Sequence, residues 1–364
     1  MMILGIDTSC DDTSAGVVTD GSRVLSSVVH SQVQLHHPYG GVVPELASRE
    51  HLGKIETVVD QALGKAHITR KDLDGIAVTI GPGLIGSLLV GLYFAKAFAY
   101  VLEIPYVGIN HLEGHILSIF LEERTPPLPF VVLTVSGGHT SLYHVKEVGH
   151  YAPLGQTLDD AAGEAFDKVA KVLGLGYPGG VVIENLARSG NKDRIRFPRA
   201  YLAPDSLDFS FSGLKTAVAL YVRRWRESEP KEVSMADIAA SFQEAVIDVL
   251  TQKVIAAAER MKVASVVVAG GVACNQALRD RVKDLASRCG MAFYYPRPAF
   301  CTDNGAMIAL AGYHRIFRGE RADLSLDVKS RYPIEDIPPL WEKNPFHPAA
   351  PAPSDPRRAL GSIS

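Results

Sequence analysis

The stretch ILGIDTSCDDTSAGVV, residues 3–18, places a polar turn between two short apolar runs and so predicts a β-hairpin. The same pattern returns as PFVVLTVSGGHTSLYHV at residues 129–145, with the polar turn at 136–140. A third turn, GGVACN at residues 270–275, follows an apolar strand and precedes a helix. Small residues in such turns let backbone N–H groups approach phosphate oxygens closely. The repeat therefore predicts two similar lobes whose turns face a common anion-binding cleft.

The segments around these hairpins indicate an α/β protein. Helices and buried strands are expected to alternate near residues 45–63, 75–80, 84–102 and 105–109. The duplicated pattern describes the two-lobed fold of actin, hexokinase and Hsp70, the ASKHA fold, with nucleotide bound between the lobes. We expect a first lobe at 1–128 and a second at 129–330 with a helical insertion at about 155–262. The Pro- and Ala-rich tail, 331–364, is expected to be disordered.

Composition excludes several classes of protein. The 364 residues are 47% hydrophobic and 21% charged, which is ordinary for a globular protein with an ample core. A formal net charge of −3 argues against a strongly basic protein that coats nucleic acid, so RNA contacts need a local patch. Neither a signal peptide nor a transmembrane helix is expected. The cysteines lack CxxC spacing and indicate free thiols in a reducing cytoplasm: Cys10, Cys274, Cys289 and Cys301.

Two histidines, His111 and His115, stand four residues apart, which puts both rings on one face of a helix. They could share a metal ion if a third ligand came from elsewhere. Asp303, at the expected start of the last long helix, is well placed to be that ligand. Two histidines and one carboxylate, with positions left open, suit a catalytic Fe(II) or Zn(II) ion. The alternative is that the histidine pair is an ordinary surface or interior feature.

Nine segments, in this order along the chain, resemble a single family. They are GIDTSCDDT (5–13), GGVVPELASR (40–49), HLEGH (111–115), VSGGHT (135–140), GEAFDK (163–168), YPGG (177–180), DFSFSGLKT (208–216), GGVACN (270–275) and CTDNGA (301–306). Together they resemble the tRNA N6-adenosine threonylcarbamoyltransferases (TsaD type), formerly known as O-sialoglycoprotein endopeptidases. The segment PELASR is similar to the bacterial and organellar branch. Asp12 stands where many members have Glu, and Cys274 where Ala or Ser is usual.

The resemblance implies transfer of a threonylcarbamoyl group from threonylcarbamoyl-adenylate to N6 of adenosine 37, in tRNAs that read ANN codons, with release of AMP. It implies one Fe²⁺ per subunit, with Zn²⁺ as the alternative, bound by His111, His115 and Asp303. The adenylate is expected to bind a cradle made by Thr134, Val135, Ser136, Gly137, Gly138, Asp167, Gly180 and Asn275. The implied partners are tRNA, a shortened paralogue of the same fold (TsaB type) and a P-loop ATPase (TsaE type).

Some residues have two interpretations. Asp11 is either a general base or orienting group near the metal, or a turn-forming residue. Glu113 follows His111 by two positions, so we expect it off the metal face, supporting a ligand or on the helix surface. Two arginine clusters either track a tRNA backbone or form solvated faces. These clusters are Arg194, Arg196 and Arg199, and Arg223, Arg224 and Arg226.

Three rival functions fit the sequence less well than the transferase. A zinc peptidase of the HExxH type needs Glu directly after the first histidine, and this chain has Leu112 there. A small-molecule kinase of the same fold explains the phosphate turns but needs no His-His-Asp site, since Mg²⁺ prefers oxygen ligands. A non-catalytic nucleotide-binding paralogue is expected to have lost the metal ligands, and this chain keeps all three.

Overall fold

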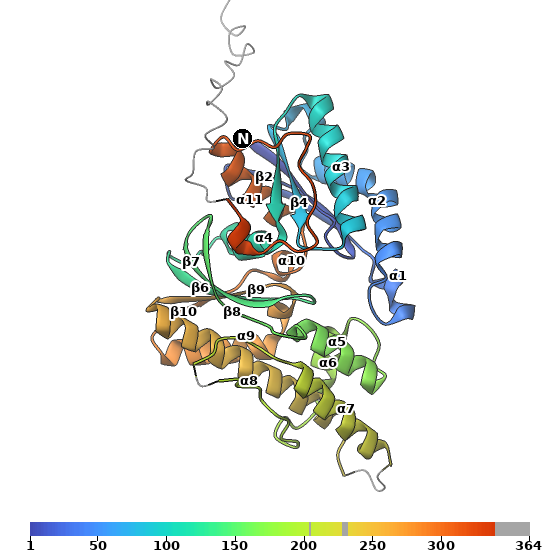
Figure 1. The fold of residues 1–364 in the computed structure, drawn as a ribbon, viewed down its shortest axis with the longest axis vertical. Helices are drawn as coiled ribbons and strands as arrows, with labels where there is room; N and C mark the ends of the chain where they lie inside the picture. Colours follow the sequence, from blue (N-terminus) through green and yellow to red (C-terminus); the bar gives the residue numbers. More distant parts are fainter. Residues whose placement is uncertain (204, 228–231, 339–364) are drawn as a thin grey trace, which may run out of the picture.

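The computed structural model describes residues 1–203, 205–227 and 232–338. It contains two five-stranded sheets, one in each lobe (Figure 1). The first sheet has the order β3-β2-β1-β4-β5, with β1 antiparallel to β2 and parallel to β4. Its strands are β1 (Met2–Asp7), β2 (Asp12–Thr19), β3 (Arg23–Ser31), β4 (Gly75–Gly81) and β5 (Tyr106–Asn110).

The second sheet repeats the first. Its order is β8-β7-β6-β9-β10, with β6 antiparallel to β7 and parallel to β9. Its strands are β6 (Phe130–Val135), β7 (Thr140–Glu147), β8 (His150–Gln156), β9 (Ser265–Ala269) and β10 (Ala292–Tyr294). Both predicted hairpins are therefore confirmed, and the same topology in both lobes confirms the duplication. Strand β8 was not predicted, because its sequence HYAPLGQ has no regular alternation of apolar and polar residues.

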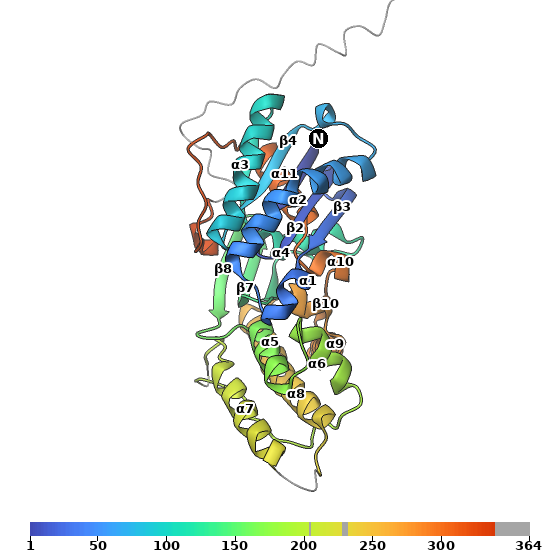
Figure 2. The same ribbon diagram turned by 90° about the vertical axis from the view of Figure 1, so that its right-hand side faces the viewer.

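Helices cover both faces of the first sheet (Figures 1 and 2). On one face, α2 (Pro44–Lys65) packs on β2 and β3, and α3 (Ile85–Leu102) packs on β4. On the other face lies α11 (Gly305–Phe317), against β1, β2 and β4. A side chain at Gly5 or Gly16 would overlap the α11 backbone, so glycine at these two strand positions lets the helix approach. The remaining helices are short: α1 (Val33–His36), α4 (His111–Leu117) and α10 (Pro298–Cys301). The 3₁₀ turns are His37–Tyr39, Arg70–Asp72, Ser118–Leu121, Gly271–Cys274 and Ile334–Asp336.

The position of α11 corrects the predicted division of the chain. We expected residues 129–330 to form the second lobe, but α11 belongs to the core of the first lobe. The chain therefore crosses back between the lobes near Asp303. Residues 331–338, predicted as part of a disordered tail, also pack on the first lobe, where Tyr332, Ile334 and Ile337 are buried. The rest of that predicted tail, 339–364, lies outside the described residues.

Helices α5 to α8 of the second lobe lie within the predicted helical insertion, and α9 is the helix expected after the turn at 270–275. Helices α5 to α9 surround the second sheet on the side away from the first lobe (Figure 1). The largely buried α8 is the centre of this group and packs on β6, α6 and α9. These helices are α5 (Ala162–Leu173), α6 (Gly179–Ala187), α7 (Ser212–Glu227), α8 (Met235–Met261) and α9 (Gln276–Arg288).

By length and hydropathy, α3 is the one helix within the described ranges that could cross a membrane. In the fold it packs against α2 and β4 through Leu88, Leu92 and Ala95, as a core helix does. Its outer side exposes Tyr93, Tyr100 and Val101.

Candidate metal centre and substrate cleft

The two histidines lie on α4, which begins directly after strand β5. The side chain of Asn110 caps this helix by accepting hydrogen bonds from the backbone N–H groups of Leu112 and Glu113. His111 and His115 are consequently one turn apart, with ring centroids 4.7 Å from one another. Both residues are buried at the junction of the lobes. The predicted placement of the pair on one helical face is therefore confirmed.

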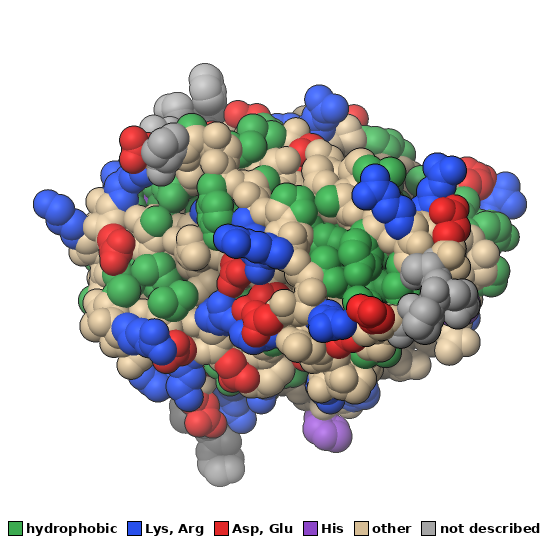
Figure 3. Space-filling model, turned by 90° about the horizontal axis from the view of Figure 1, so that it is seen from below, with side chains coloured by type: hydrophobic (Ala, Val, Ile, Leu, Met, Phe, Trp, Pro, Cys, Tyr) green, Lys and Arg blue, Asp and Glu red, His purple; other side chains and the backbone are tan. Residues whose placement is uncertain are grey.

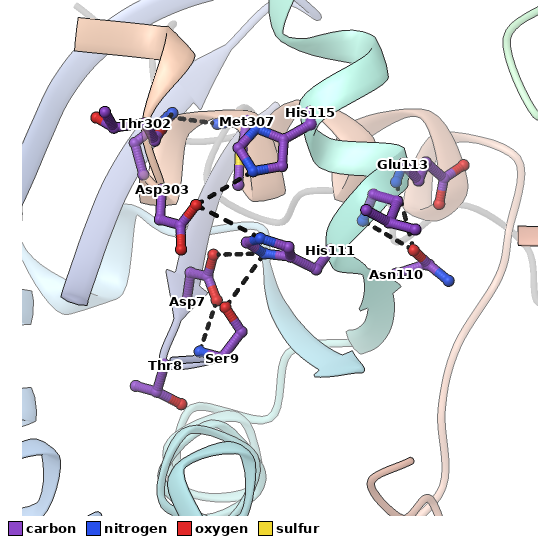
Figure 4. A network of polar contacts seen from close by, with 12 residues as sticks. Asp7, Thr8, Ser9, Asn110, His111, Glu113, His115, Thr302, Asp303 and Met307 are labelled. Atoms are coloured by element: carbon purple, nitrogen blue, oxygen red, sulfur yellow. Dashed lines mark hydrogen bonds and ion pairs between the residues drawn. The ribbon is translucent and has the colours of Figure 1, made fainter. Parts of the chain in front are cut away.

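Asp303 reaches the same point from the loop between α10 and α11. Its Oδ1 lies 3.1 Å from Nε2 of His115 and 3.4 Å from Nε2 of His111. Candidate ligand atoms of the three residues all lie within 4.8 Å of one another. Figure 4 shows the carboxylate of Asp303 facing both imidazole rings. This donor set fits a cation with open coordination positions.

A second carboxylate, that of Asp7, orients His111 through Nδ1, the ring nitrogen that does not face Asp303. Nδ1 of His111 lies 3.0 Å from Oδ2 of Asp7 and 3.2 Å from Oγ of Ser9 (Figure 4). When Nδ1–H donates to Asp7, the Nε2 lone pair points toward Asp303, which is the tautomer that a metal ligand needs. Asp7 is fully buried at the end of β1. It was not among the predicted site residues, although the buried strand that it ends was predicted.

The charges at this centre favour a cation. Burial by itself lowers the pKa of His111, but the carboxylates of Asp303 and Asp7 raise it well above its ordinary value. Burial works in the opposite sense on Asp303, whose pKa is nevertheless held well below its ordinary value by His111 and His115. Without a metal, a proton on the imidazole balances the carboxylates. A divalent cation would take over this role and release the proton.

Glu113 corrects the interpretation that it could be a helix-surface group. It is fully buried, and Arg315 of α11 binds its carboxylate through Nε and Nη2 at 3.0–3.2 Å. The hydroxyl of Tyr151, on β8 of the second lobe, donates to the same carboxylate at 3.1 Å. Arg315 also pairs with Glu320 at 2.8 Å. Glu113 therefore joins the helix of the two histidines to the helix that follows Asp303, and to the other lobe.

Asp11 lies beside the second lobe. The hydroxyl of Tyr177 donates to its Oδ2 at 3.3 Å, and its charge contributes to the raised pKa of Asp167. Asp12 is affected more by the metal centre, because burial and then the charge of Asp303 raise its pKa to about 7. The catalytic role of Asp11 remains a prediction, and Asp12 is a second candidate that sequence reasoning did not select. The sequence signal for Asp12 was its place beside two other carboxylates, because neighbouring negative charges raise the pKa of a buried carboxyl group.

The predicted cradle gathers around the turn between β6 and β7. Beyond the buried strand end at Thr134 and Val135, Ser136 accepts a hydrogen bond from the backbone of His139 and closes the turn. Gly137 and Gly138 are exposed and have open space where a side chain would stand, so a ligand can approach the backbone of this turn. Helix α5 packs against this turn, since a side chain at Gly163 would overlap Ser136.

The remaining predicted cradle residues have different local roles. Asp167 on α5 accepts a hydrogen bond from the N–H of Gly179 at 2.7 Å, and Gly180 beside it is open. Burial raises the pKa of Asp167 to about 6. Asn275 caps α9 by accepting from the N–H of Leu278, and its amide donates to Gln243 at 2.8 Å. Its side chain therefore shapes the third turn.

His139 is a neighbour of the metal centre that sequence reasoning missed. It belongs to the glycine turn, and burial together with the charges of His111 and His115 lowers its pKa to about 4. It is therefore a neutral imidazole at neutral pH. The only signal was its position next to the two glycines, which does not show where its side chain points.

Known proteins match this chain closely. The family model for TsaD, tRNA N6-adenosine threonylcarbamoyltransferase, matches residues 23–310. The chain belongs to this family. A protein of that name from Desulforapulum autotrophicum is 56% identical over 91% of this chain and 99% of its own length. The corresponding protein from Clostridioides difficile is 50% identical over 90% of this chain and 97% of its own length.

Membership of this family establishes the chain as an acyltransferase that forms N6-threonylcarbamoyladenosine in tRNA, and these relatives are bacterial. Solved structures agree on the fold alone. Full-length HypF gives a TM-score of 0.57 at 13% identity, covering 88% of this chain and 47% of that protein. Component A of the (R)-2-hydroxyglutaryl-CoA dehydratase of Acidaminococcus fermentans gives 0.51 at 17% identity, covering 86% and 98%. The two-lobed prediction is confirmed.

Proposed function

We propose that the chain transfers the threonylcarbamoyl group of threonylcarbamoyl-adenylate to N6 of adenosine 37 in ANN-decoding tRNAs, using one Fe²⁺ held by His111, His115 and Asp303. Zn²⁺ is the alternative ion. The observation that carries this proposal is the convergence of three ligand side chains beside an open glycine turn. Family membership supports the reaction type, and the closeness of these three side chains supports a metal centre for it.

The residues of the chain suit the needs of acyl transfer. When bound, the cation supplies Lewis-acid stabilisation for negative charge on the carbonyl oxygen. The N–H groups of Gly137 and Gly138 can orient the adenylate and donate to its oxygens. The carboxylate of Asp167 can accept from ribose hydroxyls. A proton from the attacking amine goes to Asp11 or Asp12, and a pKa near 7 suits Asp12 to that task.

Removal of the metal ligands tests the proposal. We expect His111→Ala and Asp303→Ala to lose bound Fe or Zn by elemental analysis and to lose tRNA modification, while circular dichroism shows a folded protein. His30→Ala is the matched control. His30 lies on β3, the outer strand of the first sheet, and contacts Glu50 of α2 rather than the metal ligands. Wild-type transfer by a variant shown to be free of metal would refute the proposal.

We also propose the two protein partners that the family resemblance implies. A shortened paralogue of this fold would dock on the outer face of α2 and α3, where Leu52, Tyr93, Tyr100 and Val101 are all more than 60% exposed. The P-loop ATPase would bind the resulting pair. Tyr100→Glu should abolish co-elution of the paralogue in size-exclusion chromatography. Unchanged co-elution would place the paralogue on another surface.

Some arginines of the two predicted clusters are held by other groups of the protein and are therefore less available to bind tRNA. Arg199 is bound to Asp248 at 2.9 Å, and Arg226 donates to the carbonyl of Val172. Exposed arginines remain at 196, 223 and 224. Figure 3, which views the helical end of the second lobe, shows Lys and Arg interspersed with Asp and Glu. We therefore propose these three arginines for the tRNA backbone, and the cytoplasm as the place of action. Charge reversal at all three should raise the KM for tRNA, and an unchanged KM would remove them from the interface.

A further inference from the structure

Two of the four cysteines meet where the third turn packs against the loop that carries Asp303. Cys274 ends the 3₁₀ turn Gly271–Cys274, and Cys301 ends the short helix α10, which packs on that turn. Both are free thiols. Their side chains lie close enough together to hydrogen-bond, and each thiol acts on the pKa of the other. The fold therefore places two thiols from different segments side by side.

The two thiols differ in their access to solvent. Cys301 is fully buried, and its Sγ donates a hydrogen bond to the backbone carbonyl of Pro296 at 2.9 Å. Cys274 is only half-buried. A disulfide forms when one thiolate attacks the oxidant and a second sulfur then displaces the leaving group. An oxidant from solvent meets Cys274 first, and Cys301 is placed to react second.

The surroundings of Cys274 favour the thiolate, which is the nucleophilic form of cysteine. The thiol of Cys301 lowers the pKa of Cys274, and the charge of Arg279 adds to this effect, although burial opposes both. Nη2 of Arg279 donates to the carbonyl oxygen of Cys274 at 2.8 Å, and its guanidinium lies 5.0 Å from the centre of the Tyr295 ring. Nε of Arg279 is buried without a hydrogen-bond partner among the described residues, so this cation keeps an unused N–H donor.

The other two cysteines have less favourable surroundings for a thiolate. Cys289 is the C-cap of α9, whereas Cys274 directly precedes Asn275, the N-cap of the same helix. A helix stabilises negative charge at its N-terminus and disfavours it at its C-terminus. At Cys10, burial and then the charge of Asp11 raise the pKa of the thiol well above its ordinary value. Cys274 is therefore the thiol of this chain that is most ready to react.

A bond between Cys274 and Cys301 would move the loop of Asp303. The sulfur atoms of a disulfide are about 2.05 Å apart, which is much closer than two thiols in contact. Cys301 would have to leave its hydrogen bond to Pro296, and Asp303 follows it by two residues. Because a misplacement of about 1 Å in a reacting geometry can cost ~100-fold in rate, such a movement should slow transfer.

We propose that Cys274 and Cys301 form a reversible disulfide that switches transfer off, with a small-molecule disulfide such as oxidised glutathione as the oxidant. The Cys274 thiolate bonds to one glutathione sulfur, and the other glutathione leaves as a thiolate with the electron pair. The sulfur of Cys301 then attacks Cys274, and the second glutathione leaves. The two protons of the protein thiols end on the two glutathione molecules, so the protein loses two electrons and the oxidant gains two. Formation of the bond depends on the thiols alone, and only its effect on transfer rests on the proposed function.

The test treats the full-length, metal-loaded protein with oxidised glutathione and removes the oxidant before the partner proteins are added. Free thiols are counted, and cross-linked peptides are mapped by mass spectrometry after digestion with trypsin and chymotrypsin. Chymotrypsin can cut at Phe293 and Tyr294, which separates Cys289 from Cys301. Single-turnover transfer to tRNA is measured before oxidation, after oxidation and after reduction with dithiothreitol.

Three variants are compared with the wild type. Cys274→Ala removes the attacking thiol. Cys289→Ala is the matched control, because it removes a cysteine from the opposite end of the same helix. Arg279→Met removes the charge beside Cys274 and keeps both thiols. The ratio of the oxidised to the untreated transfer rate is taken for each variant, so a change in the untreated rate does not affect the comparison.

The wild type should lose two of its four thiols, yield the peptide that links Cys274 to Cys301, and transfer at least tenfold more slowly until it is reduced. Cys289→Ala should respond like the wild type, and Cys274→Ala should keep its untreated rate within twofold. Arg279→Met should form the bond at least threefold more slowly.

A wild type without the linked peptide would overturn the proposal. An equal loss of transfer by oxidised Cys274→Ala, or normal transfer by a wild type that carries the bond, would overturn it as well. If the untreated wild type transfers nothing, the proposed function fails, whereas the peptide map still shows whether the disulfide forms.

Discussion

Replacing Arg315 with Met should destabilise the protein in a way that depends on pH. The Glu113 carboxylate would keep the Tyr151 hydroxyl but lose its cation, at a site where Glu113 is 1% exposed. An ionised carboxylate is too costly at such a place, so the folded variant should hold Glu113 protonated. Burial already raises the pKa of Glu113 above its ordinary 4.5, although Arg315 opposes this.

The magnitude follows from that protonation. The unfolded chain ionises Glu113 near pH 4.5, whereas the folded variant keeps the proton. The folded state is then penalised by about 1.4 kcal/mol for each pH unit above 4.5, or about 3.4 kcal/mol at pH 7 and about 0.7 kcal/mol at pH 5. The value at pH 7 lies within the ~3–5 kcal/mol expected for breaking a buried ion pair. Since the folded state binds the extra proton, stability must fall as pH rises.

Guanidinium unfolding at pH 5, 6 and 7 measures this dependence. The double variant Glu113→Gln/Arg315→Met is the control, because it has no buried carboxylate at this position. It should lose the pH dependence and recover much of the stability, as neutral replacements of buried pairs often do. A penalty for Arg315→Met that stays constant from pH 5 to 7, or remains below 1 kcal/mol at pH 7, would refute the reasoning.

Three further outcomes are expected. Because burial raises the pKa of Asp167 to about 6, its carboxylate is protonated as pH falls through 6. Calorimetry should then show adenylate-analogue affinity falling about tenfold from pH 7 to 5, a change that Asp167→Asn lacks; a pH-independent wild type would exclude Asp167 from ribose binding. Asp11→Asn should slow single-turnover transfer by about a hundredfold if Asp11 is the base. A normal transfer rate for Asp11→Asn, together with a slow rate for Asp12→Asn, would assign the proton transfer to Asp12. Gly137→Val places a branched side chain in open space, so the variant should fold yet bind the analogue more than tenfold weaker, about 1.4 kcal/mol. Equal affinity would move the ligand away from this turn.

Features that depend on a short stretch of sequence could be predicted from local sequence patterns. The hairpins follow from apolar runs that flank polar turns, and the facing of His111 and His115 follows from helical spacing alone. Asp303 was reached by its place before a helix and by resemblance to a family. Each of these inferences needs only a short segment at a time.

The interactions that were missed join distant segments. Glu113 and Arg315 are 202 residues apart, and each sits on a helix whose own pattern does not identify a partner. The position of α11 escaped prediction for the same reason, because an apolar helix face shows that it is covered but not which sheet covers it. The return of segment 331–338 to the first lobe also escaped prediction, because it depends in turn on the position of α11.

The return of α11 to the first sheet affects the order in which the chain can fold during synthesis. Domains usually fold as they leave the ribosome, N-terminal ones first. Here one face of the first sheet stays bare until the whole second lobe has been made, since α11 is what covers it. The candidate metal site likewise cannot form until Asp303, near the end of the described chain, has been made. A nascent chain that stalls in the second lobe therefore has an unfinished first lobe with an exposed apolar face, and such a face makes the chain prone to aggregate.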